Sequence, residues 1–92
     1  MPNDRRIFFS RSCDAAAERL GGYERIDASL DAAWDGLVHD PTGFSEIKCE
    51  LWFSARYIPT KPFGRVPALV WVFVIEADGD VVIDHVEEFE GY

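Results

Sequence analysis

Four basic side chains lie within residues 48–65 (KCELWFSARYIPTKPFGR) of a chain whose formal net charge is -8. They are Lys48, Arg56, Lys61 and Arg65, and Glu50 is the one acid among them. If these cations converge on one rim of a sheet, they can bind an anion such as phosphate. Lys and Arg near strand edges also prevent sheets from pairing edge to edge, so the same residues have a structural explanation. The sequence leaves both interpretations open.

Other polar residues offer weaker chemistry. His85 follows Asp84, but adjacent strand residues point to opposite faces, so this carboxylate is poorly placed to orient the imidazole. His39 ends a predicted helix, where a cation suits the helix dipole. The cysteines, Cys13 and Cys49, fit neither a metal-ligand spacing nor the disulfide framework of a small secreted domain. We expect no metal site, no cofactor and two reduced, buried thiols.

Composition and charge limit the class of protein. Ninety-two residues, 48% of them hydrophobic, fit a single domain over residues 1–92 with one core. No apolar run suits a signal peptide or a membrane span, so we expect a cytoplasmic protein with no membrane partner. The negative charge makes nucleic acid a disfavoured partner. Residues 76–92 contain seven acids and no Lys or Arg, and this stretch is expected to attract a basic partner.

The first half of the chain predicts a strand and two helices. Residues 5–11 predict a short strand, and Ser12 is the expected N-cap of a helix over Cys13–Leu20. From Tyr23 to His39, apolar residues recur at steps of three and four, which predicts one longer amphipathic helix. This helix should end before Pro41, because the residue that precedes a proline disfavours helical geometry.

The second half predicts three strands. A turn over residues 41–46 leads into a strand over Ile47–Ile58, and the proline-rich residues 59–67 predict a loop. Residues 68–75 are apolar at every position, which is typical of a central strand covered on both faces. Across an Asp-Gly turn, Val81–Val86 predicts its antiparallel partner.

This order of elements predicts the fold class. We expect an α+β domain with an N-terminal strand, a helical hairpin and a three-stranded antiparallel meander, with the helices packed on one face of the sheet. The tryptophans are expected in the core or at its rim; they are Trp34, Trp52 and Trp71.

Three features together resemble the RelE/ParE superfamily of bacterial toxin-antitoxin toxins. They are a helical hairpin whose Leu37 lies shortly before Pro41, an extended segment with arginine at 53–57 (FSARY), and the apolar hairpin at 68–86 (ALVWVFVIEADGDVVIDHV). The resemblance covers roughly residues 5–88. It implies a toxin-like role and an antitoxin protein as partner, although a homodimer would cover exposed apolar surface equally well.

RNA-cleaving members of this superfamily promote attack of a ribose 2′-hydroxyl on the adjacent phosphate. That reaction needs cations for the developing charge, together with a proton donor and acceptor. Residue by residue, Arg56 matches a middle-strand arginine, Lys48 a neighbouring lysine and Tyr92 a terminal catalytic tyrosine. An active member would use as catalytic residues Arg56, Lys61, Arg65 and Tyr92.

The rest of the superfamily's basic pattern is missing. The predicted central strand begins with Ala68 and Leu69 where an arginine is typical, and Glu87, Glu88 and Glu90 occupy the region where basic residues are typical. We therefore expect a toxin-like protein that acts mainly through protein binding, with ribonuclease chemistry degraded or absent. The alternatives are an orphan interaction module or homodimer without a toxin role, and an active mRNA endonuclease.

Overall fold

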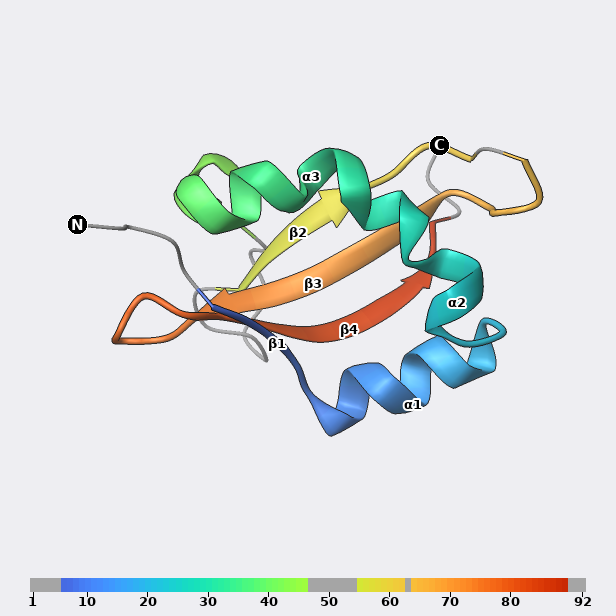
Figure 1. Cartoon of the computed structure of the whole chain (residues 1–92), viewed down its shortest axis with the longest axis horizontal. Coiled ribbons are helices and arrows are strands. Elements are labelled where there is room, and N and C mark those ends of the chain that lie inside the picture. Colours follow the sequence, from blue (N-terminus) through green and yellow to red (C-terminus); the bar gives the residue numbers. More distant parts are fainter. Residues whose placement is uncertain (1–5, 47–54, 63, 90–92) are drawn as a thin grey trace.

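The computed structural model describes residues 6–46, 55–62 and 64–89, which form an α+β domain (Figure 1). This confirms the predicted class. The described elements, in chain order, are β1 (Ile7–Phe9), α1 (Arg11–Arg19), α2 (Tyr23–Ile26), α3 (Ala28–His39), the 3-10 turn η1 (Pro41–Gly43), β2 (Ala55–Pro59), β3 (Leu69–Ile75) and β4 (Val81–Glu88). Within the described ranges, every helix is too short or too polar to cross a lipid bilayer.

The sheet is mixed and four-stranded, which corrects the predicted strand arrangement. Its order is β1-β4-β3-β2, with antiparallel pairing of β4 with β3 and of β3 with β2. β1 joins the edge parallel to β4, with Ile7 opposite Val81. Arg6 holds this edge, because its N–H donates to Asp80 Oδ1 at 3.2 Å and its guanidinium lies 3.1 Å from Asp80 Oδ2. The N-terminal strand is therefore part of the same sheet as the other three.

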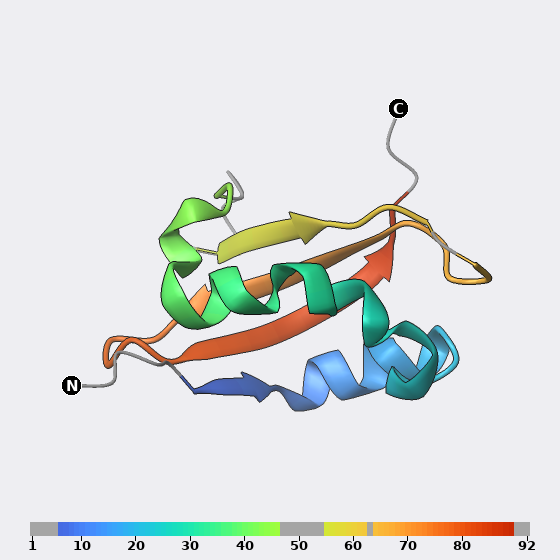
Figure 2. The same cartoon turned by 45° about the horizontal axis from the view of Figure 1, so that its top comes forward.

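The helices and one face of the sheet enclose a single core (Figure 2). β3 is the central strand beside β2 and β4, and its Leu69, Trp71 and Phe73 are fully buried against residues of all three helices. On the other face, Val72 is also buried, between Tyr57 and His85 of the flanking strands. The apolar run of β3 thus fits its central place in the sheet.

The region predicted as one helix over residues 23–39 is divided at Asp27 into α2 and α3. The Ser29 hydroxyl donates to the Ile26 carbonyl at 2.7 Å, and the Leu30 N–H donates to the Asp27 carbonyl at 2.9 Å. When a serine hydroxyl donates to a backbone carbonyl in this way, it competes with the regular backbone hydrogen bond of the helix and bends the helix. Ser29 Oγ also accepts from Trp71 Nε1 at 2.9 Å, so the break between α2 and α3 is hydrogen-bonded to β3 of the sheet.

Two further boundaries differ from the prediction. The N-cap of α1 is Ser10 and not Ser12, since the Ser10 hydroxyl accepts from the Cys13 N–H at 3.1 Å. The predicted strand over residues 47–58 is seen as β2 from residue 55 onward, and residues 47–54 lie outside the described part of the chain.

A bulge interrupts β4 opposite β3. Val72 pairs with His85, whereas the next residue, Phe73, pairs with Ile83, so Asp84 is an extra residue on β4. A bulge of this kind adds one residue to one strand and breaks the strict alternation of faces. The expectation that Asp84 and His85 point to opposite faces therefore does not apply at this point.

Candidate functional site

Arg56 lies on β2 directly opposite Phe73, on the face of the sheet that the helices cover. Its side chain is only 17% exposed. Nη1 donates to the Phe44 carbonyl at 2.6 Å and to the Thr42 carbonyl at 3.2 Å, while Nη2 donates to Glu46 Oε1 at 3.0 Å. Arg56 therefore fastens the segment 42–46 to the start of β2.

Two other described basic residues of the predicted site lie in the connection between β2 and β3. Lys61 is exposed in the loop after β2, and about 10 Å of strand separates Arg56 from Pro59 at the end of that strand. Arg65 is exposed too, and its carbonyl accepts from Arg25 Nη2 at 3.3 Å. Two of the predicted site residues, Lys48 and Tyr92, are outside the described residues.

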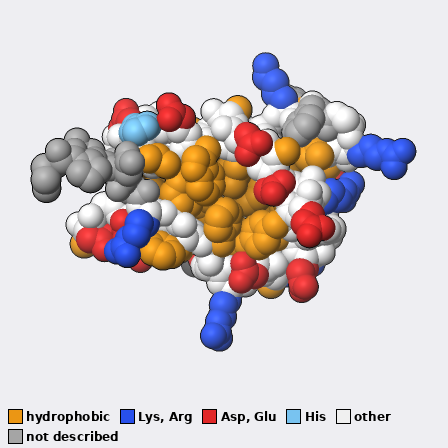
Figure 3. All heavy atoms as spheres, in the orientation of Figure 1, with side chains coloured by type: hydrophobic (Ala, Val, Ile, Leu, Met, Phe, Trp, Pro, Cys, Tyr) orange, Lys and Arg blue, Asp and Glu red, His pale blue; other side chains and the backbone are white. Residues whose placement is uncertain are grey.

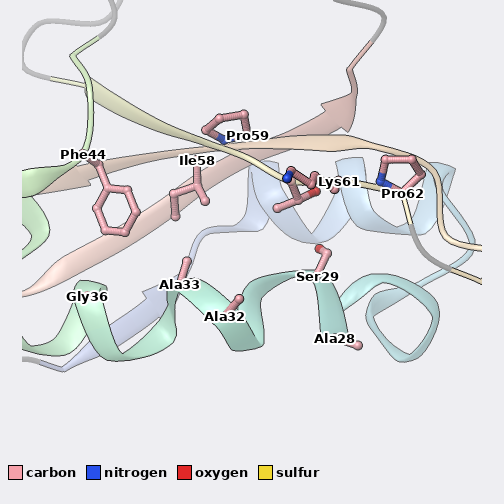
Figure 4. Close-up of a pocket in the computed structure, with 11 residues that line it drawn as sticks. Ala28, Ser29, Ala32, Ala33, Gly36, Phe44, Ile58, Pro59, Lys61 and Pro62 are labelled. Carbon is pink, nitrogen blue, oxygen red and sulfur yellow. The ribbon is translucent and has the colours of Figure 1, made fainter.

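A groove of about 510 Å³ runs between α3 and β2 (Figure 4). We call it the α3–β2 groove. One wall is α3, where Ala28, Ala32 and Gly36 follow one another at four-residue steps and so lie along one side of the helix. The facing wall is β2, which contributes Ile58 and Pro59. Small side chains on α3 leave the space that larger ones would fill.

Phe44 and Lys61 lie toward opposite ends of this groove (Figure 4). Lys61 is the one charged side chain among the described lining residues, so the groove is mainly apolar. An apolar groove with a single cation at one end suits hydrophobic side chains better than a phosphate group, which needs several donors.

Gly36 and Arg56 together position the ring of Phe44. A Cβ atom on residue 36 would lie 3.1 Å from Phe44 Cζ, so the missing side chain lets the ring approach α3. The ring also packs edge-on against Phe73, with the centroids 5.6 Å apart at 88°. Because Arg56 holds the Phe44 carbonyl, the residue is fixed through its backbone and through its ring.

The histidines pair with carboxylates on their own elements. His85 Nε2 lies 3.8 Å from Glu87 Oε2 on β4, and its side chain is 25% exposed. His39 Nε2 lies 3.3 Å from Asp35 Oδ1, one turn earlier in α3, and His39 occupies the last turn as the prediction had it. These exposed or half-exposed pairs are typical of structural interactions on a protein surface.

The one cysteine in the described residues is buried and in the thiol form. Cys13 is 0% exposed, and burial raises its pKa above the ordinary value, partly offset by a hydrogen bond with Tyr23. Cys49 lies outside the described residues. Within those residues, His, Cys, Asp and Glu side chains do not gather in any group of three or more that could hold a metal ion.

Sequence reasoning assigned the groove-facing side of α3 no role. It concentrated on the apolar stripe, of which Ile26, Leu30 and Leu37 are indeed buried. The four-residue spacing of Ala28, Ala32 and Gly36 was the available indication of a second, small-residue face. Nothing in the sequence showed that β2 would lie opposite this face.

Comparisons of this chain with protein-family models, with curated proteins and with solved structures found no match.

Proposed function

We propose that this protein acts by binding another protein through the α3–β2 groove and does not cleave RNA. This is the behaviour of a RelE/ParE-type toxin-like protein without ribonuclease chemistry, in keeping with the resemblance and with the acids Glu87, Glu88 and Glu90 where basic residues are typical. The observation that carries the proposal is the mainly apolar lining of the α3–β2 groove. Arg56 lies near it with its guanidinium bonded to the protein itself, in part through the carbonyl of the groove residue Phe44.

Energetics support this role for Arg56. Hydrogen bonds that involve a charged group contribute about 1.5–3 kcal/mol each, although partial exposure lowers this contribution. To bind a phosphate, the guanidinium would have to leave the Phe44 carbonyl and the Glu46 carboxylate, which would cost a few kcal/mol before any phosphate contact formed. The Glu46 carboxylate would also repel the phosphate. Arg56 is thus better suited to anchoring a segment than to catalysis.

The edge of the sheet beside the groove favours side-chain insertion over strand addition. β2 is the outermost strand, but its Tyr57 N–H already donates to the Ser45 carbonyl at 3.0 Å and Pro59 has no N–H. A partner strand would find few donors along this edge. Apolar side chains of a partner can instead enter the groove between Ala32 and Ile58.

An RNA cleavage assay tests the catalytic half of the proposal. We expect purified protein to leave end-labelled RNA intact at neutral pH, because the Arg56 guanidinium is already bonded to the Phe44 carbonyl and the Glu46 carboxylate. Cleavage that disappears in Arg56→Ala, or in the exposed-site variants Lys61→Gln and Arg65→Gln, would overturn it. Lys61→Gln and Arg65→Gln are included because Arg56→Ala is also expected to destabilise the fold, so that loss of cleavage in Arg56→Ala alone would not identify a catalytic role.

Induced expression in a bacterial host tests the binding half. We expect growth arrest, and we expect Ala32→Glu to relieve it, because a carboxylate placed inside an apolar groove opposes insertion of hydrophobic side chains. Ala15→Glu is the matched control, since Ala15 is also an exposed alanine on a helix but does not line the groove. Arrest that persists in Ala32→Glu, or the absence of arrest in the unmodified chain, would contradict a toxin-like role through this groove.

A further inference from the structure

A second cavity, of about 580 Å³, opens between α1 and α3. Figure 3 shows hydrophobic side chains gathered across the middle of this face, with Asp and Glu side chains beside and around them and Lys and Arg side chains nearer the outline of the molecule. The cavity is lined by three aromatic rings together with Leu30, and we call it the aromatic cleft; the rings belong to Phe9, Tyr23 and Trp34.

The three rings form a continuous surface that remains partly open to solvent. The Phe9 centroid lies 5.1 Å from that of Tyr23, edge to face, and 6.4 Å from that of Trp34, with the planes of Phe9 and Trp34 only 18° apart. Phe9 is 36% exposed and Trp34 is 40% exposed. Neighbouring exposed rings of this size are uncommon on a monomer surface and mark an interaction site more often than isolated apolar residues do.

Three carboxylates line the same cleft. Asp14 comes from the first turn of α1, while Asp27 and Asp31 come from the start of α3. All three are exposed, and in the described part of the chain none of them forms an ion pair with Lys or Arg. Asp14 Oδ1 accepts from the Tyr23 hydroxyl at 2.6 Å, which leaves its other oxygen available.

Helix dipoles explain these acids only in part. A carboxylate near a helix N-terminus is stabilising, and each N-terminus carries roughly half a positive charge. The N-termini of α1 and α3 therefore offset roughly one of the three negative charges, and the cleft keeps a net negative charge of about two. The dipoles do not explain why exposed aromatic rings lie beside the acids.

We propose that the aromatic cleft binds a Lys or Arg side chain from a basic segment of a partner protein. The aliphatic part of such a side chain packs on Leu30 and Phe9, and its charged end meets the face of Trp34 and the carboxylates. The net charge of -8 attracts a basic partner from a distance and repels nucleic acids, anionic membranes and a second copy of this chain. The inference rests on the proposed protein-binding function but uses a surface separate from the α3–β2 groove.

Fluorescence anisotropy with a labelled synthetic peptide tests the inference. The probe is a short peptide of Lys, Leu and Ala at helical spacing, and the comparison peptide has Glu in place of every Lys. We expect the Lys peptide to bind the full chain, with affinity that falls as salt is added, and the Glu peptide not to bind. Failure of the Lys peptide to bind, or equal binding of the Glu peptide, would overturn the inference.

Single substitutions locate the binding. We expect Asp31→Asn to weaken the Lys peptide about two- to fivefold, and Trp34→Ala about three- to tenfold. Asp35→Asn is the matched control, because Asp35 lies one turn further along α3, pairs with His39 and does not line the cleft. If Asp31→Asn and Asp35→Asn weakened binding equally, the attraction would be general electrostatics and the inference would be wrong.

Two further variants distinguish loss of peptide binding from loss of folding and from effects at the α3–β2 groove. Trp34→Leu keeps apolar volume at residue 34 but removes the ring, so it should weaken the Lys peptide even if Trp34→Ala does not fold; unchanged affinity would overturn the role of the ring. Ala32→Glu, in the other groove, should leave the affinity for the Lys peptide within about twofold. Cleavage of RNA by the protein would contradict the proposed function but would not affect the conclusion from peptide binding. Loss of peptide binding in a protein that still arrests growth would contradict this inference alone.

Discussion

Ser29 gives the buried indole of Trp71 its hydrogen-bond acceptor. Trp71 is 0% exposed and Ser29 is 7% exposed, and the two are joined at 2.9 Å. Ser29→Ala would leave the indole N–H without this acceptor, which costs about 1–3 kcal/mol. Urea denaturation should show this loss. Ser12→Ala, at an exposed serine of α1, is the control and should change stability by less than about 0.5 kcal/mol; equal stability of the two variants would contradict the role of Ser29.

Cys13 and Tyr23 should make the fold less stable at alkaline pH. Burial raises the pKa of Cys13 above its ordinary value of 9.0, and burial with the hydrogen bond to Asp14 raises the pKa of Tyr23 above 10.0. A raised pKa in the folded state contributes stability that is fully present below the unfolded pKa and is lost as the pH rises toward the folded value. The free energy of unfolding should therefore fall from about pH 9 upward.

Denaturation curves across this pH range measure the effect. Cys13→Ala is expected to lower stability at neutral pH through the lost packing, and to reduce the slope of stability against pH just above pH 9. The slope is the informative quantity, because a cavity alone does not depend on pH. A slope that is unchanged in Cys13→Ala would show that the thiol does not take part.

The positions of single residues could be predicted from the sequence where hydrophobic burial determines them. The unbroken apolar run over residues 68–75 correctly predicted a central strand, and its Trp71 and Phe73 are fully buried. The partners of Arg56 could not be predicted, because they lie 10 to 14 residues away on a segment whose path depends on the rest of the fold. Whether any of the basic residues takes part in catalysis stays a prediction.

Among the elements, the short segment 42–46 depends on Arg56 for its attachment to β2. Arg56→Lys keeps the charge but removes the planar fork that reaches Phe44 and Glu46 together. We expect a loss of about 1–3 kcal/mol and faster hydrogen exchange at the Tyr57 amide, which donates to Ser45 of that segment. Arg65→Lys, at an exposed site, should alter neither quantity; similar exchange in both variants would argue against the attachment.

The helix and strand segments could be predicted from local sequence patterns, but the breaks within them could not. The periodicity over residues 23–39 correctly predicts helical structure, but the break near Asp27 depends on Ser29, whose partner Trp71 is 42 residues away. The antiparallel pairing of β3 with β4 followed from the Asp-Gly turn, where Gly79 has φ 97°. The extra residue Asp84 had no indication of its own in the sequence.

At the scale of the whole molecule, charge repulsion opposes the compact state. A net charge of -8 is confined within a radius of gyration of 12.8 Å, so added salt should screen the repulsion. We expect the free energy of unfolding to rise by on the order of 1 kcal/mol between low and moderate NaCl concentrations. Chemical denaturation at several salt concentrations measures this. A variant with Asp78→Asn and Glu76→Gln, both exposed, should respond less, and a fall in stability with salt would contradict the expectation.

The α+β class could be predicted from the order of elements, whereas the complete strand order could not. Neighbouring strands joined by short turns pair locally, so β3 and β4 are readily matched from sequence. β1 has no such neighbour: its partner β4 lies on the far side of the helices and two further strands, and the Arg6–Asp80 contact spans 74 residues. No local sequence pattern predicts which edge of the sheet an isolated strand of three residues will join.

The pairing of β1 with β4 also has a consequence for synthesis of the chain. β1 leaves the ribosome before its neighbour in the sheet, which follows 74 positions later. At a translation rate of about 5–20 residues per second, β1 waits roughly 4–15 s for that neighbour, with its backbone N–H and C=O groups not yet paired in a sheet. A nascent chain stalled before β4 emerges should therefore be sensitive to protease and should recruit chaperones, whereas a chain from which β4 has emerged should do neither.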